Sequence, residues 1–156
     1  MTAIPDPYRR AAAPTGHDPQ RVPHVLASGL VALDPWWGTI QPQTLHPDLP
    51  TVGELEVIAH LRAGGAAVDT RRPEYVAASG TLPGARVVPW EEIAARADEI
   101  DPGAVTVLFC NGPQCAATPR AVRALLDAGR DPRSLAYYRG GLLDWMALGL
   151  PTAAAD

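Results

Sequence analysis

Residues 105–116 have the sequence Val-Thr-Val-Leu-Phe-Cys-Asn-Gly-Pro-Gln-Cys-Ala, and this stretch decides the fold. The apolar run from Val105 to Phe109 predicts a buried strand that leads directly into Cys110. A short Gly-Pro loop follows, and the sequence after it predicts a helix over 116–128. Backbone N–H groups and the positive end of the helix dipole would converge on Cys110, which favours an anionic, reactive sulfur. The alternative is a cysteine that only ends the strand, because free cysteine is among the most buried residue types.

The composition indicates a single soluble domain. The chain has 156 residues, 47% of them hydrophobic and 19% charged, which is enough to bury a core. A net charge of −4 gives no electrostatic reason to expect nucleic acid or an anionic membrane as a partner. We find no apolar run of about 18 residues and no signal peptide pattern, so a cytoplasmic location is expected.

The two cysteines are five positions apart, and in the cytoplasm we expect both to be reduced. Their spacing does not match a zinc knuckle, and all four histidines lie within the first 60 residues. The sequence therefore predicts no metal site.

The proline distribution divides the chain. Nine of the 17 prolines fall in residues 1–50, which predicts a tail and an extended arm there. Trp36 and Trp37 would cover part of the core or, alternatively, form a partner site. The compact domain is expected over 51–152, with a short tail at 153–156.

Short apolar runs alternate with helical patterns through this domain. This alternation predicts an α/β fold: a small, mainly parallel sheet flanked by helices on both faces. Besides the strand before Cys110, strands are expected at 66–69, 85–88 and 135–138. One helix is expected to begin at a Thr51–Glu54 capping box and to carry an apolar stripe of Val52, Leu55, Ile58 and Leu61. Further helices are expected at 74–78, 90–97 and 142–148.

Ligands bind beyond the carboxyl ends of the strands in such sheets. Asp69 and Arg71 end one predicted strand, so we expect them at the same edge as Cys110. Arg71 is expected to brace the scaffold by pairing with an acid such as Glu74. Elsewhere, Leu142, Trp145 and Leu148 are expected in the core, with one of Tyr137 and Tyr138 buried and the other at a surface or crevice.

Three segments carry a family resemblance over residues 51–152. Val68-Asp69-Thr70-Arg71 followed by Glu74-Tyr75 is similar to a rhodanese strand that ends in Asp-x-Arg. Gly80-Thr81-Leu82-Pro83-Gly84-Ala85 resembles the family's Gly-His-Ile-Pro-Gly-Ala turn, and Arg139-Gly140-Gly141 with Trp145 resembles its Gly-Gly-x-x-x-Trp ending. The chain thus looks like a single rhodanese-like domain.

The resemblance implies a sulfurtransferase with Cys110 as the nucleophile. Cys110 would take sulfur from a sulfane-sulfur donor, hold it as a persulfide and pass it to a thiol or to cyanide. The cycle implies no metal and no organic cofactor. The persulfide would be cradled by the loop Asn111, Gly112, Pro113, Gln114, Cys115 and Ala116.

Three departures from the family pattern bear on function. Thr81 replaces the usual histidine of a scaffold turn, which we expect to affect packing or a hydrogen bond. Ala116 stands where similar phosphatases carry the arginine that clamps phosphate, so phosphate ester chemistry is not expected. Asn111 replaces a basic residue, and an uncharged loop suits a neutral persulfide, a protein persulfide donor or a docked partner better than thiosulfate.

Cys115 is the fourth departure. It could resolve a persulfide or sulfenate on Cys110 by forming a disulfide, or it could simply pack beneath the helix. Three functions follow. They are a sulfurtransferase, a thiol redox sensor with a reversible Cys110–Cys115 disulfide, and a non-catalytic binding module that uses the proline-rich arm.

Overall fold

The computed structural model describes residues 24–25, 31–32 and 40–155. The chain divides into two compact units, Met1–Trp37 and Gly38–Asp156. In the first, the two-residue strands β1 (His24–Val25) and β2 (Val31–Ala32) pair antiparallel. Trp36 and Trp37 lie outside the described residues, as does the tail predicted at the N-terminus.

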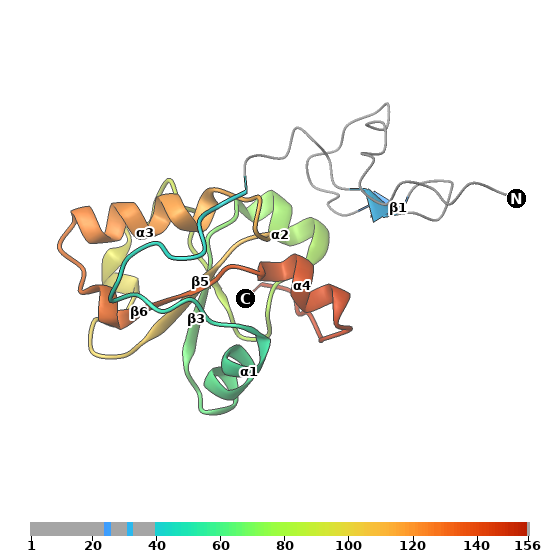
Figure 1. The fold of residues 1–156 in the computed structure, drawn as a ribbon, viewed down its shortest axis with the longest axis horizontal. Helices are drawn as coiled ribbons and strands as arrows, with labels where there is room; N and C mark the ends of the chain where they lie inside the picture. The colour runs from blue at the N-terminus through green and yellow to red at the C-terminus, as the bar shows by residue number, and fades with distance from the viewer. Residues whose placement is uncertain (1–23, 26–30, 33–39, 156) are drawn as a thin grey trace, which may run out of the picture. The chain divides into compact units, whose positions relative to one another are not determined.

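The second unit is built on a four-stranded sheet in which every pairing is parallel (Figure 1). The spatial order is β4-β3-β5-β6. Strand β5 therefore lies inside the sheet, and Cys110 follows its last residue. The strands are β3 (Ala66–Asp69), β4 (Arg86–Val87), β5 (Thr106–Phe109) and β6 (Leu135–Tyr138). The predicted α/β class and the parallel sheet are confirmed.

Helices connect these strands. They are α1 (Glu54–Arg62), α2 (Pro73–Ser79), α3 (Ala117–Asp127) and α4 (Gly141–Ala147), with short 3-10 turns η1 (Ala97–Glu99) and η2 (Pro132–Ser134). Figure 1 shows α3 on one side of the sheet and α1 and α4 on the other. All four residues of β5 are buried, because the sheet is covered on both faces.

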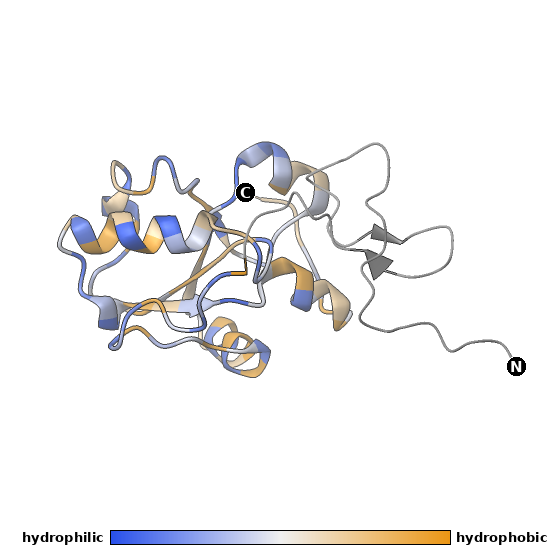
Figure 2. Cartoon of the chain, turned by 45° about the horizontal axis from the view of Figure 1, so that its top comes forward, coloured by the Kyte–Doolittle hydropathy of each residue, from blue (hydrophilic) through white to orange (hydrophobic). Residues whose placement is uncertain are grey.

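Each face of the sheet has its own apolar core. Leu108 and Tyr137 pack with Ala121 and Leu125 of α3 on one face. Polar and apolar residues alternate along α3 in Figure 2, as an amphipathic helix requires. The other core joins α1 and α4 to the sheet through Val57, Phe109, Tyr138, Leu142 and Trp145. Both tyrosines of β6 are thus fully buried, so the prediction that one would lie at a surface or crevice is wrong.

Some predicted details differ from the structure. Leu55 and Leu148, expected in the core, are 81% and 63% exposed. Helix α1 begins two residues later than predicted, with Gly53 as its N-cap in place of Thr51. The Gly53 N–H donates to Glu56 Oε2 at 3.1 Å, in place of the predicted Thr51–Glu54 capping box. Thr51 instead forms a parallel bridge with Tyr137, so sheet pairing takes precedence over capping there.

The predicted helix over 90–97 is also wrong. Residues 90–96 form a series of turns that lead into η1. The Trp90 N–H donates to the Thr70 carbonyl at 3.0 Å, and Ile93 is completely buried. These tertiary contacts outweigh the helix propensity of the alanines and glutamates. Among the described residues, no helix is long and apolar enough to cross a membrane.

Candidate active site

The loop after Cys110 is held by the start of α4. The Leu142 N–H donates to the Cys110 carbonyl at 3.0 Å, and the Leu143 N–H donates to the Asn111 carbonyl at 2.7 Å. Gly141 has a φ of +60°, and a Cβ there would collide with the Cys110 carbonyl oxygen. Glycine is therefore needed at position 141, because the cysteine loop packs directly against the Gly141 backbone.

A second contact holds the loop from the segment before the domain core. The Gln41 N–H donates to the Pro113 carbonyl at 2.7 Å. The Gln41 carbonyl accepts from Arg139 Nε at 3.1 Å and from Arg139 Nη2 at 2.8 Å. Gln41 thus connects the tip of the loop to the residue that follows β6. Residue patterns alone do not predict the contact between Gln41 and Arg139, because the two residues are 98 positions apart.

Asp69 and Arg71 form a buried ion pair beside the loop, at the edge where they were expected. Arg71 Nη2 lies 2.6 Å from Asp69 Oδ2, and both side chains are almost fully buried. The same guanidinium donates to Asn111 Oδ1 at 3.3 Å, so the pair contacts the cysteine loop. Arg71 braces the scaffold as predicted, but its acidic partner is Asp69 rather than Glu74.

Thr81 completes this buried network. Its hydroxyl donates to Asp69 Oδ2 at 2.7 Å, and Thr81 is 1% exposed. Thr81, which replaces the usual histidine of the resembled turn, therefore still makes a hydrogen bond within the scaffold. It supports Asp69 and belongs to the frame of the site.

Cys110 is buried, with 2% of its surface exposed. Its thiol donates to the Cys115 carbonyl at 3.6 Å, and the backbone N–H of Thr118, in the first turn of α3, points at its sulfur. Burial raises the pKa of the Cys110 thiol well above its ordinary value, with the neighbouring Cys115 adding to the increase. Cys110 therefore holds its proton in the resting protein.

Cys115 is the more accessible of the two thiols. A hydrogen bond from the Cys110 thiol, the N–H groups of Ala117 and Asn111 and the charge of Arg71 lower the pKa of Cys115 to about 7, against the opposing effect of burial. Cys115 is thus the more acidic of the two thiols, and the neutral Cys110 thiol is the largest cause of that acidity. The sequence pattern had pointed to Cys110 as the anionic sulfur.

Two buried polar atoms near the cysteines make no hydrogen bond within the described part of the chain: Tyr137 Oη and Gln114 Oε1. Burial raises the pKa of the Tyr137 phenol, and charge on Cys110 or Cys115 raises it further. The phenol is therefore close enough to the sulfur pair to sense its charge. Tyr137 was singled out in the sequence only as a core or crevice residue.

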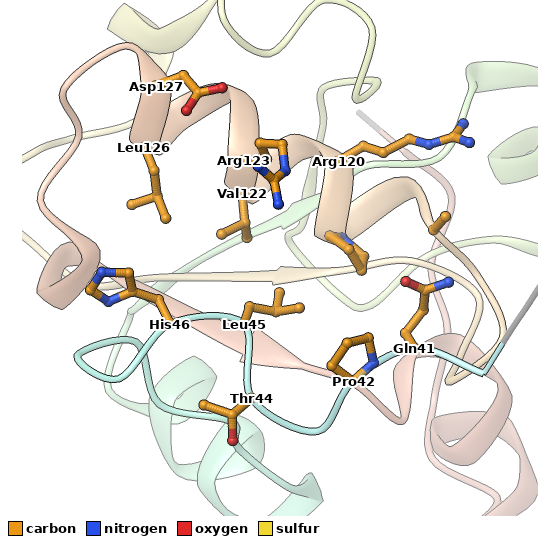
Figure 3. A pocket seen from close by; sticks show the side chains of 12 residues that line it. Gln41, Pro42, Thr44, Leu45, His46, Arg120, Val122, Arg123, Leu126 and Asp127 are labelled. Atoms are coloured by element: carbon orange, nitrogen blue, oxygen red, sulfur yellow. The ribbon is translucent and has the colours of Figure 1, made fainter.

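A pocket of about 530 Å³ opens beside the last residue of the loop, Ala116. Figure 3 shows Leu45 and Val122 on opposite sides of it. The Arg120 side chain extends away from the pocket and lies over the Trp90 ring, 4.9 Å from its centroid. No group of three or more His, Cys, Asp and Glu side chains that could hold a metal ion occurs within residues 40–155 or the two short strands.

Comparison with known proteins identifies relatives of this domain. The "HTH-type transcriptional regulator Rv0324" of Mycobacterium tuberculosis is 34% identical over 96 residues, which are 62% of this chain and 41% of that protein. The chain thus spans about two fifths of that regulator. A thiosulfate sulfurtransferase from Pseudomonas aeruginosa superposes with a TM-score of 0.57 at 25% identity, covering 83% of this chain and 25% of the other.

A rhodanese-related protein from Thermoplasma volcanium superposes with a TM-score of 0.54 at 15% identity, over 67% of this chain and 98% of the other, which supports the fold alone. The rhodanese-like domain family matches residues 55–148. These residues include the strand before Cys110, the cysteine loop and the Gly-Gly-Trp segment. The chain belongs to the rhodanese-like domain family.

Proposed function

We propose that this domain is a sulfurtransferase that holds sulfane sulfur as a persulfide on Cys110. The observation that carries the proposal is the position of Cys110 directly after β5 and beside the N-terminus of α3, with its thiol donating to the Cys115 carbonyl at 3.6 Å. A nucleophile needs a base within hydrogen-bond reach, and Cys115 has that position. Membership in the rhodanese-like family and the similarity to a thiosulfate sulfurtransferase support the same chemistry.

The sulfur pair suits a donor of the form R–S–SH. Cys110 passes its proton to the Cys115 thiolate and attacks the outer sulfur of the donor. The S–S bond of the donor breaks, and the departing R–S⁻ takes the proton back from Cys115. Cys110 then carries –S–SH, with backbone N–H groups of the loop and of α3 around it. A thiol or cyanide from outside can accept the outer sulfur.

The charges around the loop favour a neutral persulfide or a protein persulfide as donor over thiosulfate. Residues 111–116 contain no Lys or Arg, and the acidic thiol of Cys115 is the one group there that can carry a negative charge. Arg71 is paired with Asp69, Arg120 lies over Trp90, and Arg139 binds the Gln41 carbonyl. Each of these guanidinium groups is engaged by the protein, so a dianionic donor gains little electrostatic attraction at this site.

Persulfide formation can be measured by mass spectrometry. The reduced protein is mixed with a small-molecule thiol persulfide, trapped rapidly by alkylation and digested. We expect one added sulfur atom on the Cys110 peptide in the wild type, the same addition at a lower rate in Cys115→Ser, and none at position 110 in Cys110→Ser. Absence of added sulfur on Cys110 in both the wild type and Cys115→Ser, with small and with protein persulfide donors, would contradict the proposal.

A regulatory role is the second candidate. It is favoured by the contact of the Cys110 thiol with Cys115 and by the similarity to a protein named as a transcriptional regulator. In that role mild peroxide would oxidise Cys110 and Cys115 to a reversible disulfide. Loss of both free thiols under peroxide, together with failure to take up sulfur, would favour the sensor over the sulfurtransferase.

A further inference from the structure

The relation between the two thiols bears on where the sulfur goes after it reaches Cys110. Cys110 is 2% exposed, whereas Cys115 is only partly buried, and its carbonyl oxygen lies 3.6 Å from Cys110 Sγ. An acceptor from solution must enter the loop to reach the Cys110 persulfide. Cys115 already lies on the loop that encloses the inner sulfur atom.

We propose that Cys115 attacks the Cys110 persulfide and releases its outer sulfur as hydrogen sulfide, leaving a Cys110–Cys115 disulfide. This inference rests on the proposed persulfide of Cys110 and names the product of the same site. It makes the domain a two-cysteine persulfide reductase, in addition to a carrier that hands sulfur to an outside acceptor.

The atoms and electrons of the step balance. The Cys115 thiolate attacks Cys110 Sγ in Cys110–S–SH, a Cys110–Cys115 S–S bond forms, and the bond between Cys110 Sγ and the outer sulfur breaks. The outer sulfur leaves as HS⁻ with the persulfide proton. The sulfane sulfur is reduced to sulfide, and the two cysteine sulfurs are oxidised to the disulfide.

The loop geometry favours attack on the inner sulfur. Cys110 is fixed at the end of β5 by the Leu142 N–H, and the Cys115 N–H donates to the Gly112 carbonyl at 3.0 Å, which folds the loop back toward Cys110. This turn brings the Cys115 carbonyl oxygen to 3.6 Å from Cys110 Sγ, so the two residues lie side by side in the loop. The N–H groups of Ala117 and Asn111 stabilise the attacking thiolate.

Turnover then requires a reductant of the dithiol class. Such a reductant attacks the sulfur of Cys115, the more accessible of the two residues, and its second thiol then displaces Cys115. The reductant is released with an internal disulfide. Both cysteines then return to the reduced state. In the absence of a dithiol the wild-type protein stops after a single turnover.

A single-turnover experiment tests the inference on the full chain. The reduced protein is mixed with a small-molecule thiol persulfide without any other thiol, and sulfide is measured together with intact mass. The wild type is expected to give a burst of about one sulfide per chain, to end with two fewer hydrogens and no free thiol, and to turn over repeatedly when a dithiol is added.

Cys115→Ser is the matched variant, because it keeps Cys110 and a small polar side chain at 115. We expect it to lose the sulfide burst and to retain the added sulfur on Cys110 until an outside thiol is supplied. A burst in Cys115→Ser equal to that of the wild type, or a wild-type persulfide that persists without disulfide, would overturn the inference. Sulfur found on Cys115 without a disulfide would also overturn it, in favour of relay to an outside acceptor.

The proposed function fails in a distinguishable way. If neither the wild type nor Cys115→Ser ever gains sulfur on Cys110, the sulfurtransferase proposal itself is wrong and the inference falls with it. If Cys115→Ser holds a Cys110 persulfide and the wild type releases no sulfide, the sulfurtransferase stands and only the role of Cys115 is rejected.

Discussion

The guanidinium of Arg71 holds the carboxylate of Asp69 within the protein, with Arg71 Nε 2.9 Å from Asp69 Oδ1 and Arg71 Nη2 2.6 Å from Asp69 Oδ2. Neither side chain is more than 1% exposed. A buried charge is tolerated only when its partner is present, so this pair fixes the relation between the end of β3 and the cysteine loop.

Replacing Asp69 by asparagine should therefore lower the free energy of unfolding by about 3–5 kcal/mol, because the Arg71 charge would remain buried without its counterion. Thr81→Val is the matched control, since it removes a single hydrogen bond to Asp69 and should cost about 1.5–3 kcal/mol. Urea unfolding followed by circular dichroism measures both. A cost for Asp69→Asn no greater than that for Thr81→Val would contradict this account of the pair.

Gly141→Ala should disrupt the cysteine loop. Gly141 has a φ of +60°, and an added methyl group would lie 2.9 Å from the Asn111 carbonyl carbon and clash with the Cys110 carbonyl. Gly149→Ala is the control, because Gly149 has a φ of +69° with no atom in the way, and its cost should be the backbone strain of about 1–2 kcal/mol.

Thermal unfolding and the rate of persulfide formation on Cys110 distinguish these two glycines. We expect Gly149→Ala to lose some stability and keep the chemistry, and Gly141→Ala to lose more stability and slow sulfur uptake. Equal behaviour of the two variants would mean that the close approach of Gly141 to Cys110 has no consequence.

The two tyrosines of β6 should respond differently to removal of their hydroxyl groups. Tyr138 donates to Glu54 Oε1 at 2.8 Å, so Tyr138→Phe should cost about 1–3 kcal/mol. The Tyr137 hydroxyl is buried and has no hydrogen-bond partner in the described part of the protein, so Tyr137→Phe should leave the unfolding free energy unchanged or raise it by about 1 kcal/mol. Chemical denaturation compares them. A large loss in Tyr137→Phe would show that its hydroxyl binds a group such as water.

Alkylation of Cys115 should depend on pH with a midpoint of about 7, since its pKa is lowered to that value. Thiolate reacts and thiol does not, so the rate should rise with pH across this midpoint. In Cys110→Ala the hydrogen bond to Cys115, the largest cause of the low pKa, is lost, and the midpoint should move upward toward the ordinary range of cysteine. Peptide mass spectrometry after brief iodoacetamide treatment measures the profile. A pH profile that is the same in both proteins would contradict the stabilisation of the Cys115 thiolate by Cys110.

The sequence was most informative where the structure is local. The strand before Cys110, the loop and the following helix are consecutive, so their apolar runs and Gly-Pro signal identified the fold and the position of both cysteines. The buried edge formed by Asp69 and Arg71 was also expected, because parallel strands end at the same side of a sheet.

The parts that could not be predicted depend on side-chain burial and orientation or on contacts between distant residues. Arg71 pairs with Asp69 rather than with Glu74, and both side chains of the pair are buried. Residues 90–96 form turns instead of the predicted helix, and Ile93 is buried there. The division of charge between Cys110 and Cys115 depends on relative burial and on which N–H groups point at each sulfur, and neither quantity is encoded in residue spacing. The Gln41 contact joins residues almost a hundred positions apart.

That contact has a consequence for where the functional domain begins. The family match starts at residue 55, yet two hydrogen bonds reach residues before it. The Gln41 N–H donates to the Pro113 carbonyl, and the Tyr137 N–H donates to the Pro50 carbonyl. A fragment cut at the family boundary would keep every residue of the cysteine loop and lose the backbone that secures its tip. The residues that support the cysteine loop therefore begin upstream of residue 55, where the family match starts. Residues before the match help to hold the loop that carries Cys110 and Cys115.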